Sequence, residues 1–233
     1  MKKIRADHIK KITFIAIFCA IAYLCSMILP IKVMFLTLDF KDAISVMCGF
    51  FFGPSAGLFC AIVVPFIEFI TTSDTGVYGL IMNILSSVSF VSVSAVIYKY
   101  KKTIFGAVLG LISAVFSVVA VMMLANMLIT PYYMNITVDQ VIEYIPKLFL
   151  PFNTVKAVLN GSIAMLLYKP ISTLLKKTGA MRSRSVADGE QTSAGASKMR
   201  SILVAIISCV VIALALFVIF KVLGGQIDFK REI

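Results

Sequence analysis

Three polar side chains recur at helical spacing within an otherwise apolar stretch of the chain. Asn153, Lys156 and Asn160 are three and four residues apart, which places them on one face of a helix. An ammonium group deep in a membrane helix is costly, so it is expected to face the protein interior and to have a partner. Lys156 is therefore a candidate ligand-binding residue, whereas Asn160 is expected to be structural. Alternatively, Lys156 only pairs structurally, with Glu68 as the candidate partner, or reaches to the membrane surface.

Other polar residues within apolar runs are weaker candidates. Asn153 and Asn126 each lie in an apolar stretch, where an asparagine joins two helices as often as it binds a ligand, and Asn83 is expected to be structural. Asp39, Lys41 and Asp42 precede the 11 uncharged residues from 43 up to the helix break expected at Gly53-Pro54, which are about half the length needed to cross the hydrocarbon core. These three residues are therefore expected to cap that helix at the surface or to face a water-filled cavity.

The sequence contains no pattern for catalysis, metal binding or nucleotide binding. The single histidine, His8, lies in the basic N-terminal segment, which excludes histidine-based catalysis and His-rich metal sites. The five cysteines lie in apolar runs without metal-ligand spacing. No P-loop motif is present, so ATP binding by that motif is excluded. We therefore predict neither an enzyme nor a metal site.

The composition indicates a protein that crosses a membrane several times. Hydrophobic residues make up 60% of the chain, charged residues 14%, and the mean hydropathy is +1.00. A soluble domain would carry about a quarter charged residues. Five uncharged runs reach the length of roughly 20 residues that a spanning helix needs. They cover residues 12–31, 43–67, 75–98, 103–138 and 201–220.

The net charge of +11 has an uneven distribution along the chain. Basic residues cluster between apolar runs, at residues 2–11, 99–102 and 169–200, whereas most acids lie elsewhere. Such clusters are typical of cytoplasmic loops and of attraction to anionic lipid, and argue against nucleic-acid binding. They predict a multi-pass protein of the bacterial inner membrane with a cytoplasmic N-terminus.

The number of spans depends on residues 43–67, which form either one helix or two. Gly53-Pro54 is a strong local breaker, and only two helices place the Lys99–Lys102 loop in the cytoplasm with the other basic clusters. We therefore predict an all-α integral membrane protein with seven spans. The helices are expected over about 10–30, 40–53, 55–72, 76–98, 103–130, 147–175 and 201–223. A cytoplasmic linker over 178–200 precedes the last helix, and 224–233 form an extracytoplasmic tail.

Several short motifs together resemble those of one family of membrane transporters. They are Leu38–Ile44, Gly49–Gly57, Gly79–Asn83, Asn126 with Pro131–Tyr133, and Pro151–Lys156. In combination they resemble the substrate-binding subunits, or S components, of energy-coupling-factor (ECF) transporters, most of all the riboflavin-binding ones. The resemblance covers residues 8–177 and implies a six-helix substrate-binding domain over 1–177. The additional C-terminal helix and its linker lie outside it.

The resemblance also implies a function, partners and site residues. It implies capture of riboflavin, or a related flavin such as FMN, from outside for ATP-driven uptake. The partners would be a separate transmembrane coupling subunit and two cytoplasmic ABC-type ATPases, and the flavin would be the transported ligand rather than a resident cofactor. The residues that the resemblance assigns to the ligand are Asn126, Asn153, Lys156 and, in the first loop, Leu38 and Asp39.

Two small residues on the first helix bear on the partner of the protein. Ala16 and Ala20 lie one turn apart on the first helix, where they are either apolar filler or, as the resemblance implies, a docking face for the coupling subunit.

Two positions depart from the motifs of that family. Glu68 stands where the family often has a basic, Asn-containing end to the third helix. Lys41 stands where a serine is common. These departures leave the substrate open between riboflavin, FMN and another vitamin.

Two further classes of function are alternatives to flavin uptake. A membrane enzyme would need paired acids or histidines at depth, and the sequence supplies only Glu68. A non-transporting assembly or sensory protein would use the helix over 201–223 as its signalling element. A flavin chromophore that purifies with the protein would separate these classes from a flavin transporter.

Overall fold

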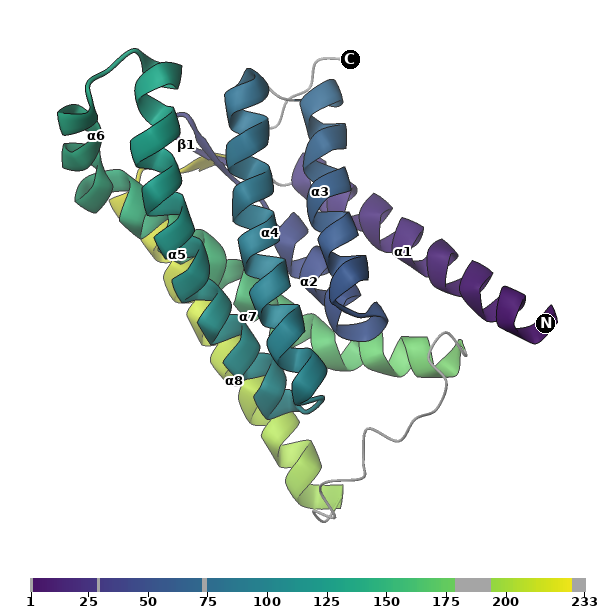
Figure 1. The fold of residues 1–233 in the computed structure, drawn as a ribbon. Helices are drawn as coiled ribbons and strands as arrows, with labels where there is room; N and C mark the ends of the chain where they lie inside the picture. Colours follow the sequence, from purple (N-terminus) through teal and green to yellow (C-terminus); the bar gives the residue numbers. More distant parts are fainter. Residues whose placement is uncertain (1, 29, 73–74, 179–193, 228–233) are drawn as a thin grey trace.

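The computed structural model of the protein describes residues 2–28, 30–72, 75–178 and 194–227. These residues form a helical bundle with one small sheet (Figure 1). The elements before the middle of the chain are α1 Lys2–Ile28, β1 Ile31–Val33, β2 Leu36–Leu38, α2 Lys41–Phe52, α3 Pro54–Thr71 and α4 Gly76–Tyr100. Those after it are α5 Ile104–Met134, α6 Val138–Tyr144, the π-helix η1 Ile145–Phe149, α7 Leu150–Lys177, α8 Ala194–Phe217, the π-helix η2 Val218–Val222 and β3 Gln226–Ile227.

Most of the described helices have the length and composition of membrane spans. Six helical segments within the described ranges are long and apolar enough to cross a bilayer. They include α1, α3, α4, α5, the continuous stretch from α6 to α7, and α8. The remaining long element, α2, has 12 residues and is too short to cross alone. The prediction of a six-helix bundle with one additional C-terminal helix is confirmed.

The break between α2 and α3 lies where the sequence predicts it. Gly53 has a φ of +101°, a conformation that glycine adopts without steric cost, and α3 begins at Pro54. The two helices then fold back closely on one another. A Cβ added to Gly57 would lie 2.7 Å from the Cα of Gly49, so this contact requires glycine. The sharp turn between α2 and α3 and the close packing of these two helices thus depend on Gly49, Gly53 and Gly57.

The helix predicted over 147–175 begins earlier and is not uniform. The chain is already helical from Val138, passes through a π-helical turn at η1 and continues as α7. Pro146 and Pro151 stand in and just after this turn, and neither has a backbone N–H to donate. A π-helical turn at such a point accommodates the missing hydrogen bonds.

The C-terminal part of the chain also differs from its prediction. α8 begins at Ala194, so the last residues of the predicted 178–200 linker are helical, as their alanine, lysine and methionine content allows. Residues 179–193 of that linker, and 228–233 of the predicted tail, lie outside the described residues. The rest of the tail contributes β3, a strand that the sequence analysis did not predict.

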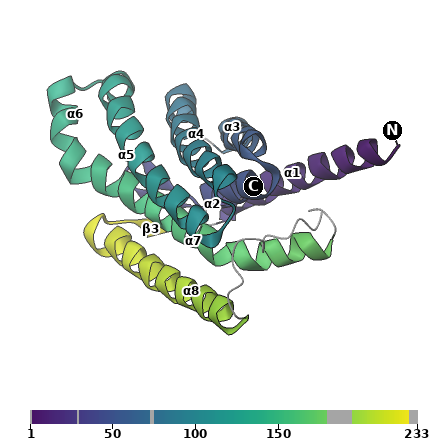
Figure 2. The ribbon, with the colours of Figure 1, turned by 60° about the horizontal axis from the view of Figure 1, so that its bottom comes forward.

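The small sheet has the strand order β2-β1-β3, with both pairs antiparallel. Ile31 pairs with Leu38 across the hairpin and with Ile227 on its other side. Strands of two or three residues are too short for a period-two pattern to be detected in sequence, and for this reason they were missed. In Figure 1 the sheet lies within the upper part of the bundle, and Figure 2 shows its strand β3 beside the C-terminal end of α8.

Buried apolar side chains form two clusters. The larger lies between α1, α2, α3, α4, α5 and α7 and fills the bundle. The second lies between the β1–β2 hairpin, the region from α6 to α7, and the end of α8. α8 packs along α7 on the outside of the bundle (Figure 2). The hairpin is therefore held between the bundle and the additional C-terminal helix.

Candidate ligand-binding site

A cavity of about 470 Å³ opens among the helix ends that face the small sheet. It is bounded by the end of α1, the hairpin, the end of α3, the start of α4, the end of α5 and the start of α7. Its polar side chains include Asp39, Glu68, Asn83, Asn126, Asn153 and Lys156. Aromatic rings of Phe35, Tyr78, Tyr133 and Phe152 also line it. A mainly apolar hollow with a few converging polar groups is typical of a small-molecule site.

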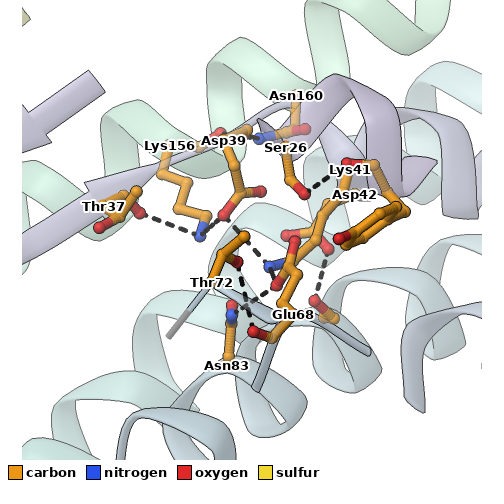
Figure 3. A network of polar contacts seen from close by, with 12 residues as sticks. Ser26, Thr37, Asp39, Lys41, Asp42, Glu68, Thr72, Asn83, Lys156 and Asn160 are labelled. Atoms are coloured by element: carbon orange, nitrogen blue, oxygen red, sulfur yellow. Dashed lines mark hydrogen bonds and ion pairs between the residues drawn. The ribbon is translucent and has the colours of Figure 1, made fainter. Parts of the chain in front are cut away.

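Lys156 lies at one wall of the cavity and is 7% exposed. Its Nζ donates to Oδ2 of Asp39 at 3.0 Å and to the backbone oxygen of Thr37 at 3.5 Å (Figure 3). The ammonium therefore has the internal partner that its depth requires. That partner is not Glu68, the candidate from sequence, which pairs instead with Lys41. The β1–β2 hairpin brings Asp39 close to α7, and Lys156 therefore pairs with Asp39 rather than with Glu68.

Asp39 joins Lys156 to a second buried cation. Oδ2 of Asp39 lies 3.3 Å from Nζ of Lys41, which is 1% exposed and also forms an ion pair with Glu68. Glu68 in turn accepts a hydrogen bond of 3.0 Å from the side-chain amide of Asn83. A continuous chain of ion pairs and hydrogen bonds therefore runs from α7 through the start of α2 to α3 and α4 (Figure 3). Buried charges need such pairing because each alone would carry a large desolvation penalty.

The charges of this network do not cancel completely. Asp42 is also buried and accepts a 2.5 Å hydrogen bond from the hydroxyl of Ser87. Three carboxylates and two ammonium groups give a formal sum of 2 − 3 = −1. Of the three charges expected at a surface or a wet cavity, Asp39 lines the cavity, whereas Lys41 and Asp42 are buried behind it.

One carboxylate oxygen of Asp39 and one of Glu68 have no hydrogen-bond partner among the described residues. These atoms are Oδ1 of Asp39 and Oε1 of Glu68. In each side chain the other oxygen holds the cations. An unsatisfied buried acceptor is costly, so these two positions are places where a donor from water or from a ligand would stabilise the protein.

Asn160 has the structural role expected of it. Its Oδ1 accepts from the backbone N–H of Ala43 at 2.9 Å, and its Nδ2 donates to the backbone oxygen of Asp39 at 2.9 Å. The amide thus satisfies one of the free N–H groups in the first turn of α2 and fixes the backbone that carries Asp39. Asn160 shares a helical face with Lys156 but lies one turn farther from the cavity.

Asn126 and Asn153 both line the cavity, as the sequence predicts. The Nδ2 of Asn126 donates to the backbone oxygen of Met122 at 2.7 Å, and that of Asn153 donates to Phe149 at 2.8 Å. Oδ1 of Asn126 accepts from the hydroxyl of Thr130 at 3.0 Å. These bonds hold each amide against its own helix and so fix its orientation at the cavity wall.

Leu38 does not line the cavity, although it was predicted to bind the ligand. It is fully buried in the second apolar cluster, whereas the preceding Thr37 lines the cavity. Successive side chains of a strand point to opposite faces, so only one of these two residues can face the ligand. The prediction of Asp39, just beyond the end of β2, agrees with the cavity, and that of Leu38 does not.

Several cavity residues were not singled out from the sequence as binding residues. Asn83 was assigned a structural role, yet it lines the cavity and holds Glu68. Tyr78, Tyr133 and Phe35 form an aromatic wall, with ring centroids of neighbouring pairs 6.3 Å apart. Aromatic residues at helix ends are common in membrane proteins, so their sequence positions alone do not indicate a site.

The predicted docking pair lies away from the cavity. Ala16 and Ala20 are both on the exposed side of α1, whereas Ala22 is fully buried against the bundle. Two exposed small residues one turn apart would let another helix approach closely. Their role in docking stays a prediction.

The fold and the cavity define a small-molecule-binding protein embedded in the membrane. The chain matches the family model of the ECF transporter, substrate-specific component, over residues 10–172, and it belongs to that family. It is 28% identical to the riboflavin transporter RibU of Staphylococcus aureus (strain TCH60) over 185 residues, which are 76% of this chain and 97% of that protein.

A solved structure, of the S component of a bacterial ECF transporter, resembles the present fold. It is 30% identical in sequence, with a TM-score of 0.62, and the match covers 72% of this chain and 99% of that one. The predicted membership of the S-component family is thus confirmed. The chain is a multi-pass membrane protein and part of a transporter. The family match ends at residue 172, so α8 and β3 lie beyond it.

Proposed function

We propose that this protein captures riboflavin from outside the cell and delivers it to the other subunits of an ECF transporter. The observation that carries the proposal is the cavity in which Asn126, Asn153 and Lys156 converge beside aromatic rings. A flavin has an apolar ring system with a hydrogen-bonding edge and a polar ribityl chain. The amides and the ammonium suit that edge, and the rings of Phe35 and Tyr133 suit its faces.

The size of the cavity supports a ligand of this kind. Its volume of about 470 Å³ falls within the range of roughly 300–1,000 Å³ that is usual for small-molecule sites. The likeness to the Staphylococcus aureus riboflavin transporter supports the same ligand. Among the described residues that line the cavity, the charged ones are Lys32, Asp39, Glu68 and Lys156, whose formal charges sum to zero. We therefore expect uncharged riboflavin to be preferred to its phosphate, FMN, for which this set offers no excess positive charge.

Loop charge supports an orientation with the cavity on the outer side. The α4–α5 connection contains Lys101 and Lys102, and the last turn of α7 contains Lys176 and Lys177. These lie at the opposite end of the bundle from the cavity. The positive-inside rule places them in the cytoplasm, together with the N-terminus of α1, and so places the hairpin and the cavity outside.

The partners follow from the family and from the absence of a P-loop motif in the sequence. A substrate-specific component needs another subunit to supply energy. We propose a transmembrane coupling subunit that docks on the exposed face of α1 carrying Ala16 and Ala20, and two cytoplasmic ATPases.

The ligand is tested by titrating the purified full chain in detergent with riboflavin and following quenching of flavin fluorescence. We expect saturable binding at one site per chain, and weaker binding of FMN. Thiamine and biotin serve as control vitamins. Saturable binding of a control vitamin without binding of riboflavin would overturn the flavin assignment and favour an S component with another substrate.

A further inference from the structure

The hairpin of β1 and β2 lies between the cavity and the segment formed by the end of α8, η2 and β3. Its residues face two ways. Met34, Phe35 and Thr37 line the cavity, whereas Ile31 and Val33 are buried in the second apolar cluster, on the side of α8. The position of the hairpin therefore decides both how the cavity is covered and where Asp39, one residue beyond β2, meets Lys156.

The hairpin is poorly built to hold this position by itself. Its strands have three residues each, and a two-residue turn, Met34-Phe35, joins them. Met34 has a φ of +54°, a conformation that favours glycine and is uncommon for other residues. A two-stranded hairpin is marginal in water even with a favourable turn, and needs a third strand or a packed helix. The fold supplies both from the C-terminal segment.

The third strand is β3, which pairs with β1 on the side away from β2. Lys32 pairs with Gln226 and Ile31 with Ile227. Without β3, β1 would be an edge strand with unpaired backbone groups. The packed helix is the end of α8 with η2, where Ala215 and the fully buried Ile219 lie in the same cluster as Ile31. Figure 2 shows β3 turning back toward the bundle from the C-terminal end of α8.

The contact of β3 with β1 requires two glycines in the turn between η2 and β3. Gly224 has a φ of +66°, and the N–H of Gly225 donates to the backbone oxygen of Ile219 at 2.9 Å. A Cβ on Gly225 would lie 2.5 Å from Cγ2 of Ile219 and 3.3 Å from Cγ2 of Ile31. The two glycines therefore allow the chain to reverse tightly and to reach β1.

We propose that residues 215–227, here named the C-terminal clamp, hold the hairpin over the cavity and so set the rate at which the ligand leaves. The inference deepens the proposed function and rests on it for the identity of the ligand. The clamp lies beyond the family match, which ends at residue 172. It acts through the hairpin rather than by touching the ligand, because none of its residues lines the cavity.

The test compares two truncations of the full chain that differ by one strand. A chain that ends at Gly225 lacks β3, whereas a chain that ends at Ile227 keeps it and is the matched control. Two quantities are measured in detergent: amide hydrogen exchange of a peptide covering residues 30–38 without ligand, and the riboflavin dissociation rate from flavin fluorescence. In the shorter chain we expect faster exchange in the hairpin and dissociation roughly tenfold faster, a change equivalent to about 1.4 kcal/mol.

A second pair of variants tests the packed side chain without shortening the chain. Ile219→Ala removes a fully buried side chain of the clamp, and Ile207→Ala removes an exposed one on the same helix. The first is expected to accelerate hairpin exchange and riboflavin release, and the second to change neither. Equal exchange and equal release in both pairs would overturn the proposal, as would faster exchange with unchanged release.

These measurements distinguish a wrong proposal about the C-terminal clamp from a wrong proposal about the ligand. Hydrogen exchange is measured without any ligand, so it reports on the hairpin even if riboflavin does not bind. Absence of riboflavin binding to the full chain would refute the flavin assignment alone. Normal binding with identical hairpin exchange in all four variants would refute the clamp alone.

Discussion

Replacing Lys156 with methionine removes a cation that both lines the cavity and belongs to the buried ion-pair network. Methionine keeps the length of the side chain but not its charge or its hydrogen-bond donors. The change therefore separates a ligand contact from simple filling of space. Its effect on folding and its effect on binding differ in size, and both can be estimated from the contacts of Lys156.

The effect on folding is limited because Asp39 keeps a second cation. Lys156 lies 3.0 Å from Oδ2 of Asp39, and Lys41 lies 3.3 Å from the same oxygen. Breaking an isolated buried ion pair costs about 3–5 kcal/mol because a charge is left uncompensated. Here Asp39 remains paired, so we expect a smaller loss and a protein that still folds. A thermal melt without ligand measures this loss.

The effect on binding is expected to be larger. A hydrogen bond from an ammonium group to a buried ligand is worth about 1.5–3 kcal/mol, which corresponds to an affinity roughly 10- to 150-fold weaker. Riboflavin titration followed by fluorescence quenching measures the change. The same result is expected for Lys156→Ala, with a larger loss of packing.

Lys147→Met is the matched control. Lys147 is 65% exposed and pairs with Glu143, one turn before it and also exposed, outside the cavity. Such a surface pair contributes little to stability, so riboflavin affinity and melting temperature should both stay near those of the unaltered protein. Unchanged affinity in Lys156→Met, with the protein folded, would refute the assignment of Lys156 to the ligand.

Three further predictions concern folding, docking and orientation. Lys41→Met should destabilise the protein by about 3–5 kcal/mol, because it leaves Glu68 without its buried cation; a melting temperature equal to that of the unaltered protein would contradict this. Ala16→Leu combined with Ala20→Leu should preserve riboflavin binding by the isolated protein yet reduce ATP-dependent uptake in cells, because leucine blocks close helix approach; intact uptake would remove α1 as the docking surface. A cysteine in place of Lys102 should resist an impermeant thiol reagent in intact cells, whereas labelling there would reverse the proposed orientation.

The helices and much of the site could be predicted because their signals are local in sequence. Uncharged runs mark the spans, and Gly53-Pro54 marks the break that divides α2 from α3. The spacing of Asn153 and Lys156 places them on one helical face whatever the rest of the fold does. Both residues line the cavity.

The pairings within the site could not be predicted, because they join remote parts of the chain. Lys156 bonds to Asp39 across 117 positions, and nothing near either residue distinguishes Asp39 from Glu68 as the partner. The same holds for Ile31 and Ile227, at opposite ends of the chain. The side chain of Leu38 lies outside the cavity lining, because a shared motif indicates a loop but not the face to which each of its side chains turns.

The shortness of α2 affects the path that a captured molecule must take. At 12 residues α2 is roughly 18 Å long, against a hydrocarbon core of about 30 Å. The cavity wall formed by Asp39 stands at the beginning of this helix, and Gly53 ends it. In the orientation proposed above, a molecule beside Asp39 lies about 18 Å, little more than half of the hydrophobic thickness, from the far end of α2. If the protein delivers its ligand toward that end, as we propose, the opening would be shorter than a full crossing and would have to pass the closely packed pair of α2 and α3.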